Sequence, residues 1–265
     1  MFASVVVLAL FAAVTGVSAF DKCDRGAGSH LPSLDTDKMV DKLIANHDSG
    51  AWVQIGANTM DEELADNNPL MHILDKVPHW NKYFMEPIPH NYDRLLQNAK
   101  KWPNTTTIQA ALTGDGGNFE GIGTLYCLEG YHLPSHAHHL SKSTQQTHSA
   151  NELCSFDKKH VLKHFPRGIV VDVAVTKMSV SVFLRMYGIE DIRFLVLDTE
   201  GFDAAILQIF PLSATRPPVI VYEHIHLLPE DRKQLDNFLM DHCYILYAEK
   251  VNTFAVQKDF YATLS

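Results

Sequence analysis

Apolar and polar residues along this chain fall in short blocks rather than in single alternation. The stretch FLVLDTEGFDAAIL, residues 194–207, shows the pattern most clearly. Four consecutive apolar residues lead into Asp198, Thr199 and Glu200, and apolar residues return at helical spacing after Gly201. A continuous apolar run is typical of a parallel strand with helices over both faces. The block predicts a buried strand, a polar corner and a helix, although acids at such a corner can also simply cap the helix.

The remaining blocks predict an α/β fold. We expect strands at 51–55, 82–85, 106–112, 119–128, 169–175, 194–197, 219–222, 244–248 and 252–256. We expect helices at 91–102, 179–187, 202–209 and 229–242, and one more in the stretch that ends at residue 77. Because strands and helices alternate, we predict a doubly wound, mainly parallel, Rossmann-like sheet with helices on both faces. The last two strands are too close together for a crossover helix, so one edge strand should be antiparallel.

Glycine or acidic residues follow several of the predicted strands. Gly56 ends the first strand, Glu86 the second and Asp115 the third. Open α/β sheets bind ligands beyond the carboxyl ends of their strands, where glycine lets the backbone approach and a carboxylate accepts hydrogen bonds from a diol. Each of these residues alone is also compatible with an ordinary turn. The residues that follow Gly56, Met60 among them, do not complete a GxGxxG motif, so a diphosphate cradle is not expected.

In combination, these motifs resemble the FkbM-type S-adenosylmethionine-dependent methyltransferases. The matching pieces are VQIGAN (53–58), FMEPIPHNYDRLLQNA (84–99), ALTGDGG (111–117), FLVLDTEGFDAAIL (194–207) and VIVYEHIHL (219–227). The resemblance runs from about residue 52 to about residue 256. It implies a class I methyltransferase fold.

The resemblance also implies where the cofactor and the chemistry lie. Contacts to S-adenosylmethionine are implied at Gln54, Gly56, Asn58, Glu86 and Asp115. The corner formed by Asp198 and Glu200 is implied to lie near the transferable methyl group or its acceptor. A hydroxyl acceptor needs a general base, and the catalytic candidates are Asp198, Glu200 and His224.

Histidines offer a possible metal site in two places. His224 and His226 are one residue apart on a segment expected to be extended, so their rings should point the same way. They could bind a metal together with a carboxylate, or one ring could pack while the other bonds to a loop carbonyl. We favour the second interpretation and expect no metal ligand. The His-rich stretch 129–152 is interpreted as a surface loop or lid, with histidines that are solvated rather than metal-binding.

The N-terminus predicts entry into the secretory pathway. Residues 3–19 are almost wholly small or apolar, and 17–19 have the small-x-small form of a signal-peptidase site. We predict a signal peptide at 1–19, an N-terminal segment at 20–50 and the methyltransferase domain at 51–258. A membrane anchor is the alternative for the apolar run, but the cleavage site favours its removal. We therefore expect a secreted or lumenal protein without a stable membrane span, and the glycosylation sequon at Asn104 agrees with this location.

Cysteine usage agrees with an oxidising compartment. Cys23, Cys127, Cys154 and Cys243 all follow the predicted cleavage site, and they suggest two disulfides with three possible pairings. Cys127 and Cys154 flank one polar loop and are our first choice for a pair. Cys243 follows a helical pattern and could equally be a buried free thiol.

Charge and motifs together narrow the function. The formal charge of −9 and the lack of a basic block argue against a nucleic-acid partner. We expect a methyltransferase that uses S-adenosylmethionine and acts on a hydroxyl of a sugar or small metabolite, so its partner is a small-molecule or glycan acceptor. The alternative is a secreted, non-catalytic binding or scaffold protein on the same fold. A nicotinamide-dependent enzyme is a third hypothesis, which the missing glycines disfavour. The acceptor and the oligomeric state stay open.

Overall fold

A computed structural model describes residues 33–61, 70–114, 121–129 and 154–264. The predicted signal peptide, Asp115 and the His-rich stretch from residue 130 onward lie outside these residues. Among the described helices, none combines the length and the apolar character that crossing a bilayer requires.

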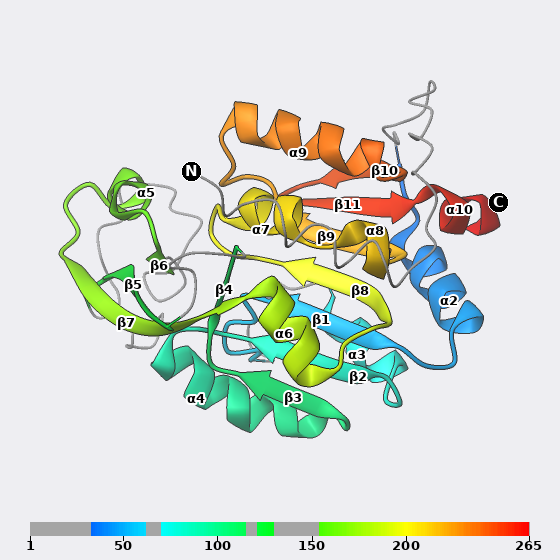
Figure 1. Cartoon of the computed structure of the whole chain (residues 1–265), viewed down its shortest axis with the longest axis horizontal. Helices are drawn as coiled ribbons and strands as arrows, with labels where there is room; N and C mark the ends of the chain where they lie inside the picture. Colours follow the sequence, from blue (N-terminus) through cyan, green and yellow to red (C-terminus); the bar gives the residue numbers. More distant parts are fainter. Residues whose placement is uncertain (1–32, 62–69, 115–120, 130–153, 265) are drawn as a thin grey trace, which may run out of the picture.

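The main sheet has seven strands in the order β10-β11-β9-β8-β1-β2-β3, which Figure 1 shows running from top to bottom. The pairs among β3, β2, β1, β8 and β9 are all parallel, whereas β11 is antiparallel to both of its neighbours. This arrangement confirms the doubly wound, mainly parallel class. The antiparallel strand is not the outermost one, because β11 is inserted between β9 and β10. The strands are β1 (Ala51–Ile55), β2 (Asn81–Met85), β3 (Thr105–Ile108), β8 (Ile192–Leu197), β9 (Val219–Glu223), β10 (Tyr244–Glu249) and β11 (Asn252–Gln257).

Helices cover both faces of this sheet, and each face has its own apolar cluster. Val53 and Leu195 belong to the cluster with α6, α7 and α9, whereas Trp52 and Phe194 belong to the cluster with α2, α3 and α10. Neighbouring residues of one strand are therefore buried on opposite faces, which explains the unbroken apolar runs in the sequence. The helices are α2 (Thr36–Asn46), α3 (Met71–Lys76), α4 (Pro89–Asn98), α6 (Val180–Tyr187), α7 (Asp203–Ile209), α8 (Leu212–Thr215), α9 (Pro229–Asp241) and α10 (Lys258–Tyr261).

A second, four-stranded sheet lies beyond the carboxyl ends of the main strands, at the left of Figure 1. Its order is β4-β7-β5-β6, and a short helix, α5 (Lys158–His164), follows β6. The strands are β4 (Ala111–Thr113), β5 (Gly121–Leu128), β6 (Cys154–Ser155) and β7 (Val170–Ser179).

A disulfide between Cys127 and Cys154 joins β5 to β6, with 4.4 Å between the two Cα atoms. This bond confirms the predicted pair. Cys243 is disulfide-bonded as well, so the alternative of a free thiol at this position is wrong.

The second sheet corrects several predicted elements. The strand expected at 106–112 is two strands, because the chain leaves the main sheet after Ile108 and β4 then pairs with β7. The strands expected at 119–128 and 169–175 are β5 and the longer β7, which pair with each other outside the main sheet. Among the described residues, four α-helices, α2, α5, α8 and α10, were not predicted. The missed helices are short or lie in polar stretches with a weak apolar stripe.

Candidate active site

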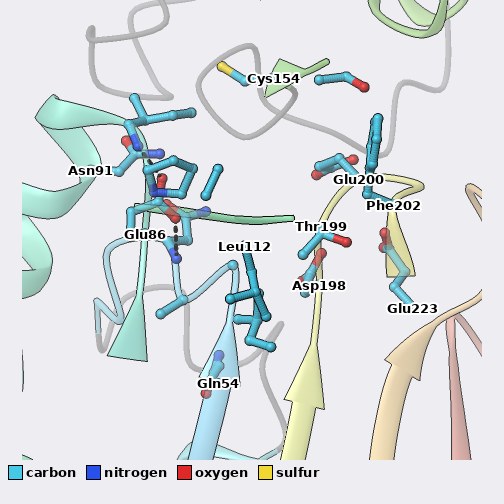
Figure 2. Close-up of a pocket in the computed structure, with 18 of the residues that line it drawn as sticks. Gln54, Glu86, Asn91, Leu112, Cys154, Asp198, Thr199, Glu200, Phe202 and Glu223 are labelled. Atoms are coloured by element: carbon cyan, nitrogen blue, oxygen red, sulfur yellow. Dashed lines mark hydrogen bonds between the residues drawn. The ribbon is translucent and has the colours of Figure 1, made fainter. Parts of the chain in front are cut away.

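A cavity of about 410 Å³ opens at the carboxyl ends of the main strands. Its walls come from the loops after β1, β2, β8 and β9 and from β4, β5 and β6 of the second sheet. Figure 2 shows Glu86 and Asn91 on one side of this cavity and Glu200 and Glu223 on the other. The sheet thus brings together acids that are more than 100 positions apart in the sequence.

Gly56 sets how closely β1 and β8 approach each other at this end. Its φ of +78° lies in the left-handed region, and a Cβ atom here would sit 1.7 Å from the carbonyl oxygen of Asp198. The amides of Gly56 and Ala57 both donate to the carbonyl of Met85, at 2.9 Å each. Only glycine fits this turn, because a side chain would overlap the Asp198 carbonyl.

Glu86 is held rigidly at the end of β2. Its carboxylate accepts the backbone amide of Asn58 at 2.9 Å and that of Ile88 at 3.0 Å, one on each oxygen. Burial raises the pKa of Glu86 to about 7, while these hydrogen bonds and one from the Asn91 side chain lower it. A carboxylate has about four acceptor sites and these three hydrogen bonds occupy three of them, so the group can still accept a hydrogen bond from a ligand hydroxyl.

In the floor of the cavity, two polar side chains have a buried oxygen atom without a hydrogen-bond partner in the described part of the chain. Gln54 is 3% exposed, and its Oε1 atom has no hydrogen-bond partner within the described part of the chain. The same holds for the hydroxyl oxygen of Thr59. Buried polar atoms of this kind are costly unless a ligand or water satisfies them. Met60 belongs to the apolar cluster beside Met71, so it forms part of the wall and leaves the cavity open.

The acidic corner after β8 is tied to the end of β9 by Asp203. This fully buried carboxylate accepts the Thr199 hydroxyl at 2.8 Å, the Thr199 amide at 3.3 Å and the Glu223 amide at 3.3 Å. Burial raises the pKa of Asp203 to about 6, against the pull of these hydrogen bonds. Asp203 was missed in the sequence, because an acid in the first turn of a helix is ordinarily interpreted as a dipole-stabilising residue.

Glu200, Glu223 and His226 converge beside the cavity. The Nε2 atom of His226 lies 3.4 Å from Glu200 Oε2 and 3.6 Å from Glu223 Oε2. Glu200 has a φ of +53°, a left-handed conformation that is uncommon for a residue other than glycine, asparagine or aspartate. Asp198 and Glu200 both line the cavity, and their role near the reacting groups stays a prediction.

His224 lies apart from the other two catalytic candidates. Its Nδ1 atom is 2.9 Å from the hydroxyl of Thr253 on β11, and burial lowers its pKa. The expectation that His224 and His226 point the same way is wrong, because β9 ends at Glu223 and the following residues form a turn. Strand alternation therefore does not apply to this segment, and a catalytic role for His224 has no support from its position.

The second sheet and the helix after it supply the wall that faces the acidic corner. Phe156, after β6, packs edge-to-face on Phe202 with 5.4 Å between ring centroids. His160 on α5 lies next to His226, with ring centroids 5.4 Å apart. No sequence signal identified His160, because it lies in a polar stretch without periodicity.

Comparison with known proteins adds the family. The family model for the methyltransferase FkbM domain matches residues 54–246. The chain belongs to the FkbM methyltransferase family. No curated protein matches this FkbM methyltransferase. Among solved structures it is similar to precorrin-6y C5,15-methyltransferase from Geobacter metallireducens GS-15, with 10% sequence identity, a TM-score of 0.40 and coverage of 89% of this chain and 92% of that chain.

Proposed function

We propose that this FkbM methyltransferase uses S-adenosylmethionine to methylate a hydroxyl group of a sugar or small metabolite. The observation that carries the proposal is one cavity with a rigid, buried carboxylate, Glu86, on one side and an acidic corner, Asp198 and Glu200, on the other. A cavity of about 410 Å³ falls in the range used by small-molecule sites.

The residues on the Glu86 side fit the cofactor. Glu86 would accept a ribose hydroxyl, as acids after the second strand do in related folds. The turn at Gly56 and Asn58 and the amide oxygen of Gln54 would contact its amino-acid part, which supplies donors to buried acceptors. When bound, S-adenosylmethionine supplies an electrophilic methyl group.

The acidic corner fits the acceptor. A hydroxyl must lose its proton as it becomes methylated, and a carboxylate within reach can take that proton. Asp198 is a better candidate than Glu200, because both line the cavity but Asp198 is the more exposed of the two. The apolar contact between Phe156 and Phe202 would hold the acceptor in line with the methyl group, a positioning effect that can supply most of the rate.

We place the enzyme in the secretory lumen or outside the cell. The Cys127–Cys154 disulfide and the disulfide-bonded Cys243 support this location, because such bonds persist in oxidising compartments. Glycans and secreted metabolites are available there as acceptors.

Calorimetry with S-adenosylmethionine and with its demethylated product tests the cofactor assignment. We expect both to bind with micromolar affinity, about −8 kcal/mol. If the folded protein binds neither ligand, the cofactor assignment is wrong and a binding or scaffold role is favoured instead.

Mass spectrometry of acceptor mixtures after incubation with the cofactor tests the transfer. We expect Asp198→Asn to lower kcat by roughly 100-fold or more while the affinity for the demethylated cofactor is unchanged. Asp231→Asn, an exposed acid in the first turn of α9, is the matched control and should retain full activity. Equal activity in the two variants would exclude Asp198 as the base.

A further inference from the structure

Two histidines and two glutamates from four separate segments gather at one point beside the cavity. His160 comes from α5, Glu200 from the corner after β8, Glu223 from the end of β9 and His226 from the turn that follows. Within the described residues, one ligand atom each from His160, Glu200 and His226 lie within 4.8 Å of one another, and so do one each from Asp198, Glu200 and Glu223. Glu200 is common to both groups.

The spacing of these atoms matches metal ligands better than direct hydrogen bonds. Distances of 3.4 Å and 3.6 Å from His226 Nε2 to the two glutamates exceed the usual hydrogen-bond range of about 2.7–3.2 Å. Adjacent ligands around a cation with bonds of about 2.0–2.1 Å lie roughly 3.0–3.4 Å apart. The His226 and Glu200 atoms thus already stand at the separation that a shared cation requires.

Burial and charge also favour a bound cation at this cluster. The side chains of His226, Glu223 and Glu200 are only 2%, 9% and 14% exposed. Carboxylates gathered in such a place repel one another unless a cation balances their charge. The left-handed backbone at Glu200 is a strained conformation, and strain of this kind concentrates at functional sites.

We propose that His160, Glu200 and His226, together with Glu223, form a binding site for a divalent first-row transition metal such as Zn²⁺ or Mn²⁺. The mixed nitrogen and oxygen donors favour these ions over Mg²⁺ and Ca²⁺, which prefer oxygen ligands alone. Glu200 and Glu223 also line the cavity, so the cation lies next to the acceptor half. There it would bind the acceptor oxygen and lower the pKa of its hydroxyl, a role that rests on the proposed methyl transfer.

Metal titration of the full chain, purified without a histidine tag and treated with a chelator, tests the site. We expect one equivalent of Zn²⁺ or Mn²⁺ to bind by calorimetry, and Co²⁺ to give a visible absorption band from a nitrogen-containing ligand set. Mg²⁺ should bind far more weakly. His226→Ala and Glu200→Gln should each weaken Zn²⁺ binding by roughly 100-fold or more, because each removes a ligand.

His72→Gln is the matched control, since His72 is a half-exposed histidine on α3, away from the cluster. It should bind Zn²⁺ like the unaltered protein. Affinity for the demethylated cofactor, measured on the same samples, shows that each variant is folded and tests the proposed function separately. Zn²⁺ affinity that survives both His226→Ala and Glu200→Gln would overturn the site, and so would a protein that binds the cofactor product but no transition metal. Metal binding without cofactor binding would instead overturn only the proposed function.

Discussion

At the scale of single residues, Glu86 braces two loops at the end of the cavity that we propose to bind the cofactor. Its carboxylate fastens the loop after β1 through Asn58 and the start of α4 through Ile88. Burial raises its pKa from 4.5 to about 7, so the folded protein holds this proton at pH values where the unfolded chain has released it. Glu86 alone therefore makes the free energy of unfolding fall as the pH rises from about 4.5 to 7.

Ligand binding should show the opposite pH trend. Ribose hydroxyls donate better to the ionised carboxylate, so we expect affinity for the demethylated cofactor to rise about tenfold between pH 6 and pH 8. Calorimetry across this range measures it. Glu86→Gln should bind more weakly and lose the trend, whereas Glu190→Gln, an exposed acid elsewhere, should keep it. A pH-independent affinity in the unaltered protein would place the ribose away from Glu86.

A substitution at Gly56 tests whether stability requires the close approach of β1 and β8. In Gly56→Ala the new methyl group would meet the Asp198 carbonyl oxygen, so we expect the free energy of unfolding to fall by more than about 3 kcal/mol, or folding to fail. Gly188→Ala is the control, because Gly188 has a φ of +61° with no atom within 4 Å of the added carbon. In that variant the free energy of unfolding should fall by only about 1 kcal/mol, the cost of a left-handed alanine, as measured by urea unfolding. Equal losses in both variants would show that contact at Gly56 is unimportant.

At the scale of elements, the two-residue strand β6 supports much of the cavity wall that we propose to face the acceptor. It leads into Phe156 and then into α5, which holds His160, and the Cys127–Cys154 bond anchors it to β5. Replacing both cysteines by serine should lower the free energy of unfolding by about 3.5 kcal/mol, the loop-entropy value for a separation of 27 residues. Chemical denaturation measures this loss.

The same double variant tests whether β6 supports only one side of the cavity. We expect transfer activity to fall because Phe156 and His160 lose their anchor, while affinity for the demethylated cofactor stays within about twofold, since β1 and β2 are untouched. The double alanine variant should behave alike and thereby exclude an effect of the serine hydroxyls. A parallel loss of cofactor affinity would show that β6 supports both sides.

Sequence patterns predicted the elements well where the burial of a segment follows from its own run of apolar residues. The apolar runs at 51–55 and 194–197 became the central strands β1 and β8, and the corner at Asp198 followed from them. The stretch 106–112 was misjudged because the change from one sheet to the other depends on pairing with β7, far along the chain. His160 was missed for the same reason, since only the folded second sheet brings α5 to the corner.

At the scale of the whole molecule, the proposed function assigns the two sides of the cavity to different parts of the fold. On that proposal the loops after β1 and β2 of the main sheet hold the cofactor, whereas Phe156, after β6, and α5 lie toward the acceptor. The second sheet lies beyond the ends of the main strands (Figure 1). The acids after β8 and β9 lie between the two. If the proposal holds, we expect changes in β6 and α5 to alter acceptor specificity more than cofactor binding.

This division predicts how ligands stabilise the molecule. At about 100 times its Kd, the demethylated cofactor should raise the free energy of unfolding by about 2.7 kcal/mol and Tm by roughly 5–10 °C. Thermal unfolding should show the same shift in the protein lacking the Cys127–Cys154 bond, despite its lower starting Tm, but little shift in Glu86→Ala. NADH should have no effect, because the Gly56 turn lacks the further glycines of a diphosphate cradle. A shift with NADH and none with the cofactor product would mean that the shared sheet serves hydride chemistry rather than methyl transfer.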